Sequence, residues 1–183
     1  MGVRRTVAVV ALALALVAIT GCTAVRVETP DPAAIPDGPL EAMGGDATGP
    51  VVELGSGVGG GVGWRYAIYP SGNEWCTQLE MVEFTAAGCG DLLPEGGAAF
   101  GSVGTGEPRA DGVIPIEGIV TEETVTVWLV ADDGRRAPAM LMPLEPAGLE
   151  GHAFVAFVPA DTTVTHLQAL AISGEVLETY ELP

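Results

Sequence analysis

The sequence predicts an all-β domain of seven to nine short antiparallel strands over residues 64–183. Short apolar or alternating segments recur there, with turn signals roughly every 8 to 12 residues, a pattern typical of sandwiches and small barrels. Sustained apolar periodicity near 3.6 residues, which would indicate an amphipathic helix, is absent from this range. Two Gly-containing turns separate pairs of apolar runs, as they do in β-hairpins.

The first part of this domain contains two predicted strands and a long loop. Residues 64–69 are rich in aromatic side chains and end at a Pro-Ser-Gly-Asn turn. Residues 75–84 form the second strand, in which apolar and polar side chains alternate between two faces. A short segment at 88–90 follows. Residues 91–112 are Gly-rich, with Phe100 as the large apolar side chain near their middle, and we expect a long loop there.

The second part supplies the remaining strands, which we expect at residues 113–120, 125–131, 135–142, 152–158, 164–172 and 176–182. Asp132-Asp133-Gly134 is a good hairpin turn, because Asp-Gly provides the positive φ of a type I′ turn. Residues 143–151 are expected to form a loop. The nearly continuous apolar run at 152–158 suits the centre of a sandwich. Together these features favour an immunoglobulin-like β-sandwich.

Residues 22–63 precede this domain and are expected to form a disordered tether. They are rich in Pro, Gly, Ala and acidic residues, which break helices and strands. Residues 51–54 are the exception and could add a short edge strand. Residues 55–60 match the pattern G-x-G-x-x-G, but a dinucleotide site requires that motif to follow a strand and open a helix. We therefore expect a flexible linker at this motif.

The first 22 residues carry a specific family signature. Arg4 and Arg5 precede an uninterrupted apolar run at 7–19, which is too short to span a bilayer as a helix. The run ends in Ile19-Thr20-Gly21-Cys22, which resembles the lipobox of bacterial lipoproteins. That resemblance implies a cleaved signal peptide at 1–21 and a diacylglycerol thioether on Cys22. It implies a membrane-anchored protein on the extracytoplasmic face, held by acyl chains.

The charge of the chain is strongly negative, with a formal net charge of −17 at pH 7. All 24 acidic residues follow the leader, and the chain contains no lysine. Such a surface repels phosphate backbones, which argues against nucleic acid as a partner. It also repels anionic lipid headgroups, so attachment to the membrane depends on the lipid at Cys22. The abundance of Gly, Ala and Val without Lys is typical of GC-rich, actinobacterial-type sequences.

Two cysteines remain once Cys22 is assigned to lipid. Cys76 and Cys89 then form the even pair expected of an exported domain, and we predict a disulfide between them. A reactive redox pair is the alternative, but redox motifs favour the closer C-x-x-C spacing. The stretch from Trp64 through these cysteines is similar to small domains of exported bacterial proteins, a likeness that implies no activity.

Residues that could carry chemistry are few. The two histidines, His152 and His166, lack an H-x-x-x-H spacing and are expected to be structural. No serine sits in a G-x-S-x-G elbow. The pairs Glu122-Glu123 and Asp132-Asp133 read as solvated turn residues, with weak calcium binding as the less favoured alternative. Trp64, Tyr66 and Trp128 either pack in the core or form an exposed aromatic patch.

These observations favour a non-enzymatic protein without metal or cofactor. We expect a lipid-anchored cell-envelope protein whose β-domain binds another envelope protein or a cell-wall component. One alternative is a small envelope hydrolase that uses carboxylates, or a serine with His152 or His166. Another is a structural lipoprotein that only provides spacing.

Overall fold

A computed structural model describes residues 33–43, 47–82, 84–91, 96–107 and 112–183 of the chain. Twelve strands occur in these ranges, and every pairing between them is antiparallel. They form three four-stranded sheets, so the predicted all-β class is confirmed. The strands number more than the seven to nine that we predicted, and the reasons lie in three segments described below.

Sheet A is an antiparallel meander in which each strand pairs with the next one along the chain. It contains β1 (Val52–Gly59), β2 (Val62–Ser71), β3 (Glu74–Met81) and β4 (Phe84–Gly90). Because side chains alternate between the faces of a strand, Tyr66 and Ile68 on β2 share one face with Thr77 and Leu79 on β3.

Sheets B and C are built from the rest of the chain, which alternates between them two strands at a time. Sheet B has the order β5-β6-β10-β9, and sheet C has the order β12-β11-β7-β8. The strands of sheet B are β5 (Phe100–Thr105), β6 (Val113–Val120), β9 (Met140–Pro143) and β10 (His152–Pro159). Those of sheet C are β7 (Thr126–Ala131), β8 (Arg136–Pro138), β11 (Val164–Leu170) and β12 (Val176–Glu181).

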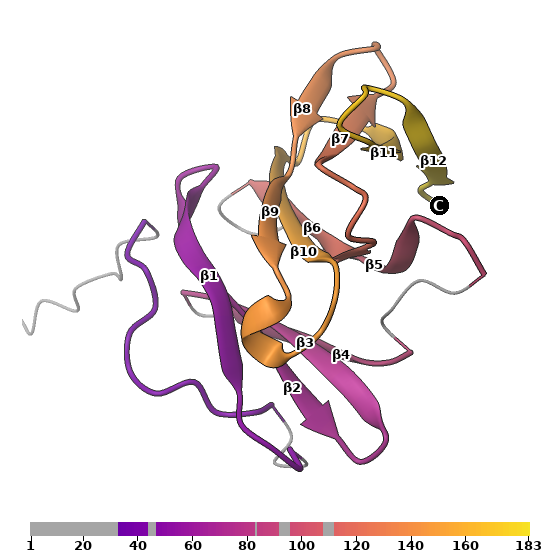
Figure 1. Ribbon diagram of the computed structural model, residues 1–183. Helices are drawn as coiled ribbons and strands as arrows, with labels where there is room; N and C mark the ends of the chain where they lie inside the picture. The colour runs from indigo at the N-terminus through magenta and orange to yellow at the C-terminus, as the bar shows by residue number, and fades with distance from the viewer. Residues whose placement is uncertain (1–32, 44–46, 83, 92–95, 108–111) are drawn as a thin grey trace, which may run out of the picture.

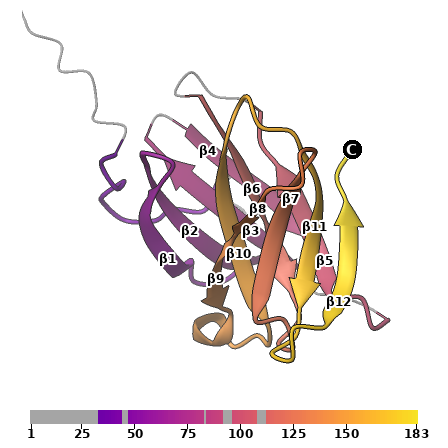
Figure 2. The ribbon, with the colours of Figure 1, turned by 90° about the horizontal axis from the view of Figure 1, so that it is seen from above.

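Sheet B is the middle layer of three, with sheet A below it and sheet C above it in Figure 1. Figure 2 shows the same succession from purple sheet A to yellow β12. One core lies between sheets A and B and contains Ile119 and Val155. The other lies between sheets B and C and contains Val120 and Phe154. Strand β10 therefore buries both faces, which explains its nearly continuous apolar sequence.

The expectation of a disordered tether up to residue 63 is wrong for β1, which pairs with β2 along its length. The G-x-G-x-x-G segment is a hairpin strand and turn rather than a flexible linker. Its glycines leave space for large side chains: a Cβ at Gly57 would lie 3.3 Å from the Trp64 ring, and one at Gly59 would overlap Phe157. The glycines that make this segment resemble a linker are needed because the two rings pack closely against its backbone.

Two further predictions are corrected. The predicted loop at 91–112 contains β5, whose Phe100 ring packs edge-on against Phe154 with centroids 6.1 Å apart. The single strand predicted at 135–142 is two strands, β8 in sheet C and β9 in sheet B, so the chain changes sheets there. Pro138, which lacks a backbone N–H, ends β8 at this crossing. The loop at 143–151 includes one 3₁₀ turn, η1 (Glu145–Ala147).

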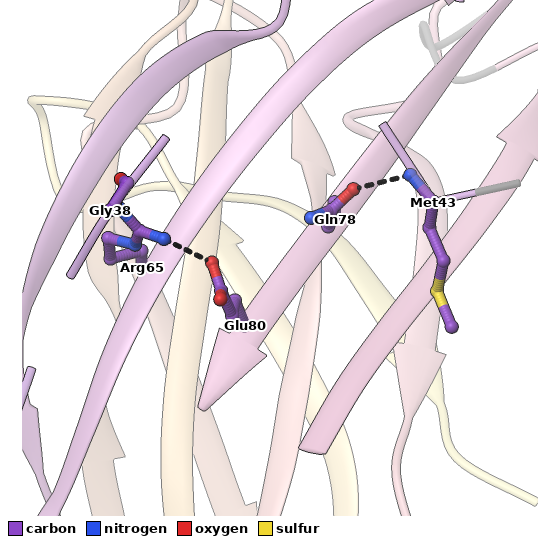
Figure 3. A network of polar contacts seen from close by, with 5 residues as sticks. All are labelled: Gly38, Met43, Arg65, Gln78 and Glu80. Atoms are coloured by element: carbon purple, nitrogen blue, oxygen red, sulfur yellow. Dashed lines mark hydrogen bonds and ion pairs between the residues drawn. The ribbon is translucent and has the colours of Figure 1, made fainter. Parts of the chain in front are cut away.

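Residues 33–43, which we call the strap, lie against the outer face of sheet A. Buried Arg65 on β2 joins the strap to the sheet: its Nη1 donates to the Gly38 carbonyl oxygen at 2.8 Å. Its Nη2 pairs with Glu80 on β3 at 2.6 Å, as Figure 3 shows. A Cβ at Gly63 would overlap the carbonyl oxygen of Ala34, so the two backbones are in close contact.

The far end of the strap is held in the same way. The backbone N–H of Met43 donates to Oε1 of buried Gln78 at 3.0 Å (Figure 3), and the Tyr69 hydroxyl donates to the Met43 carbonyl at 3.2 Å. A segment that we expected to be free is thus attached to sheet A by buried side chains. The backbone of the strap supplies hydrogen-bond partners to the buried polar side chains of sheet A, which would otherwise have fewer partners.

Candidate functional site

The predicted lipid-attachment residue, Cys22, and the predicted signal peptide at 1–21 lie outside the described residues. Within the described part of the chain, no helix is long and apolar enough to cross a membrane. The predicted disulfide is present: Cys76 and Cys89 face each other across β3 and β4 with an S–S distance of 2.01 Å. Cys76 is fully buried and shares the outer face of sheet A with Tyr69, so the disulfide is close to the strap.

The two histidines are not brought together. His152 begins β10 in sheet B and pairs with Val120, and its buried Nδ1 has no hydrogen-bond partner. His166 lies on β11 in sheet C opposite Val130, and its Nδ1 lies 2.9 Å from the Thr165 hydroxyl. Val120 is the last residue of β6, next to the turn into β7, whereas Val130 lies near the far end of β7. The two histidines are therefore at different ends of sheets B and C.

The predicted aromatic candidates divide between core and surface. Trp64 and Tyr66 are buried between sheets A and B, so an exposed patch formed by this pair is wrong. Trp128 on β7 is half-buried. The turn at Asp132-Asp133 is exposed, and Asp133 forms an ion pair with its own neighbour Arg135 at 2.5 Å. The Arg135 hydrogen bonds hold the pKa of Asp133 below its ordinary value.

A surface cleft of about 460 Å³ lies where the β6–β7 turn, the β9–β10 loop and β12 meet; we call it the end cleft. It is lined by Gly97, Ala98, Ala99, Thr121, Glu122, Glu123, Glu150 and Leu177. Its three glutamates are exposed and come from two separate loops. Glu178 on β12 closes one side, because its Oε2 accepts hydrogen bonds from the backbone N–H groups of Ala99 and Phe100.

Exposed apolar side chains stand beside the end cleft. Val125 follows the Glu122-Glu123 turn and hydrogen-bonds through its backbone to Leu170, while Val176 precedes Leu177. Ile172, in the turn between β11 and β12, is 91% exposed, and Val125 and Val176 are each 46% exposed. Exposed apolar side chains are ordinary when they occur singly, whereas neighbouring ones favour contact with another molecule. We call Val125, Ile172 and Val176 the apolar rim, because they adjoin lining residues of the end cleft along the chain or through the Val125–Leu170 hydrogen bond.

The sequence identified only part of this arrangement. Glu122 and Glu123 were recognised as turn residues, but Glu150 and Leu177 belong to segments that approach them only in the folded chain. Ile172 was the available signal, because an isoleucine directly before Ser-Gly in a hairpin turn has no strand face to occupy.

The described residues contain no group of three or more His, Cys, Asp or Glu side chains placed to hold a metal ion together. No family model, curated protein or solved structure matches the chain. Its function is therefore argued from the cleft, the charge and the anchor signature.

Proposed function

We propose that this protein is a lipid-anchored component of the bacterial cell envelope that binds a partner protein through the end cleft. The lipobox-like Ile19-Thr20-Gly21-Cys22 supports the anchor. Intact-mass spectrometry of membrane-extracted protein tests it: we expect a mass that begins at Cys22 and includes acyl chains. An unacylated chain that retains residues 1–21 would refute this part of the proposal.

We propose further that sheets B and C form an immunoglobulin-like sandwich, with sheet A as an additional layer. The order β5-β6-β10-β9 corresponds to strands A-B-E-D of that fold, and β12-β11-β7-β8 corresponds to G-F-C-C′. In this correspondence the turns 121–125 and 171–175 are the B–C and F–G loops. Antibody variable domains bind antigen with those two loops, which supports binding at the same end here.

The single observation that carries the binding proposal is a cleft lined by three exposed glutamates, with exposed Val125, Ile172 and Val176 in the two turns and the strand that adjoin it. Its electrostatic complement is a segment that presents arginine or lysine beside apolar side chains. An exposed ion pair contributes roughly 0.2–1 kcal/mol, so three pairs together correspond to about a tenfold change in affinity.

The test uses the acylated full chain in phosphatidylcholine nanodiscs and a fluorescein-labelled peptide of alternating arginine and leucine. We expect Glu122→Gln, Glu123→Gln and Glu150→Gln combined to weaken binding about tenfold, measured by fluorescence anisotropy in physiological salt. The matched control is Glu53→Gln, Glu74→Gln and Glu181→Gln, which removes the same charge from exposed sites elsewhere. Ile172→Ser tests the apolar rim separately.

Two results would contradict the proposal. Equal weakening by both triple variants would mean that the peptide responds to net charge alone. Unchanged binding in Ile172→Ser, together with equal affinity for a peptide of arginine and serine, would remove the apolar rim from the interaction.

A further inference from the structure

A smaller cavity of about 160 Å³ lies between sheets A and B, and it shares no lining residue with the end cleft. We call it the Glu117 chamber; it is lined by Tyr66, Thr77, Gly88, Cys89, Ser102, Val103, Gly104, Glu117 and Gly118. Gly88 and Cys89 on β4 are exposed, whereas Tyr66 is fully buried. The chamber therefore extends from the edge of β4 to a buried polar floor.

Two oxygen atoms on this floor are poorly paired within the described residues. The Tyr66 hydroxyl and Oε2 of Glu117 are both shielded from solvent, and neither makes a hydrogen bond of regular geometry. The Tyr66 hydroxyl lies close enough to Glu117 and Thr77 to interact with both, but these contacts do not have the alignment of regular hydrogen bonds. Part of the Glu117 side chain is accessible, but this oxygen is not. Buried polar atoms are nearly always paired, because an unpaired one loses its hydration without gaining a hydrogen bond. Two such atoms in one cavity point to a ligand.

The electrostatics of the chamber identify the charge of that ligand. Loss of solvation raises the pKa of Glu117 to about 7, and the nearby Tyr66 hydroxyl offsets part of the rise. Burial, followed by the charge of Glu117, raises the pKa of Tyr66 well above its ordinary value. Among the described residues no basic side chain lines the chamber, since the buried Arg65 pairs with Glu80 on the opposite face of sheet A. Within that part of the chain, an ionised Glu117 therefore has no compensating positive charge.

We propose that the Glu117 chamber binds a compact cation between the Glu117 carboxylate and the hydroxyl groups of Tyr66, Thr77 and Ser102. The oxygen atoms of these side chains are hard ligands, which suit calcium or sodium ions and also accept hydrogen bonds from an ammonium group. This site is separate from the end cleft, so neither proposal depends on the other.

The size of the chamber limits the ligand. A water molecule occupies about 30 Å³, so the volume suits one ion with a few waters or a small alkylammonium group. Drug-sized ligands and sugar rings need pockets of about 300 Å³ or more.

Isothermal titration calorimetry on the acylated full chain in nanodiscs tests the proposal, with calcium chloride and methylammonium chloride as separate titrants at constant ionic strength. Saturable binding of calcium alone identifies a metal site, and saturable binding of methylammonium identifies an ammonium site. We expect Glu117→Gln to weaken binding at least tenfold and Tyr66→Phe to weaken it several-fold. Glu74→Gln, an exposed residue on β3, is the matched control and should leave affinity unchanged.

A second readout follows from proton linkage. Because burial raises the pKa of Glu117 to about 7, cation binding near neutral pH should release protons, seen as different heats in PIPES and HEPES. Glu117→Gln should abolish this difference. The proposal is overturned if neither titrant binds, or if binding persists in Glu117→Gln and is lost in the end-cleft triple variant. Near-UV circular dichroism establishes that each variant is folded.

Discussion

The buried carboxyl group of Glu117 makes the stability of the fold depend on pH in an unusual direction. In the folded protein burial raises the pKa of Glu117 to about 7, whereas an ordinary glutamate has a pKa of 4.5. Between these values the folded state binds more protons than the unfolded state, so the contribution of this group to stability falls as pH rises. It is fully present below pH 4.5 and lost above about pH 7. At 1.36 kcal/mol for each pH unit, the loss is about 3 kcal/mol.

Glu117→Gln isolates this effect, because glutamine has nearly the same shape and does not ionise. We expect the variant to gain about 3 kcal/mol relative to the natural protein between pH 4.5 and 8.5. Urea denaturation followed by tryptophan fluorescence, with chelator present and no added cation, measures the difference at each pH. Glu74→Gln controls for the loss of one exposed acid. A difference between Glu117→Gln and the natural protein that stays constant within about 0.5 kcal/mol would refute the reasoning.

Two other perturbations test the fold around the strap. Replacing both Cys76 and Cys89 with alanine should lower the free energy of unfolding by about 3 kcal/mol, because the disulfide closes a short loop in the unfolded chain; urea denaturation measures it. Gly63→Ala should displace the strap, because the added Cβ would overlap Ala34. Thermolysin, which cleaves beside apolar residues and needs no Lys or Arg, should then cut residues 33–43 faster. Gly88→Ala is the matched control, since its Cβ would meet no atom within 4 Å; equal cleavage in both variants would count against the contact.

The sequence predicted those elements whose signals are local. The hairpin at Asp132–Gly134 has the expected positive φ at Gly134, and the apolar run of β10 is at the centre of the layers. Strand β5 was missed, and β1 was predicted only at residues 51–54, because glycine occupies many of the positions where alternating side chains would have signalled a strand. The glycines of β1 reflect the size of the rings of Trp64 and Phe157, which approach them from later strands. Single-sequence patterns do not contain that information.

The candidate sites depend even more on long-range contacts. The end cleft joins Glu122, Glu150 and Leu177, and the Glu117 chamber joins β2, β3, β4, β5 and β6. In the sequence Glu117 has the spacing of an ordinary solvent-facing strand residue, because alternation does not reveal that another sheet covers the strand. Only the position of sheet A over sheet B makes it a buried acid.

The strap also determines how far the domain can travel from a membrane. With a lipid at Cys22, as proposed, only the ten residues 23–32 separate the anchor from Ala33, the first residue of the strap. Fully extended, such a segment reaches at most about 40 Å, whereas a free tether ending at Gly63 would reach more than three times as far. If the proposed lipid is present, the domain stays in a thin layer above the lipid surface. The proposed partner would then have to present its binding segment within that layer.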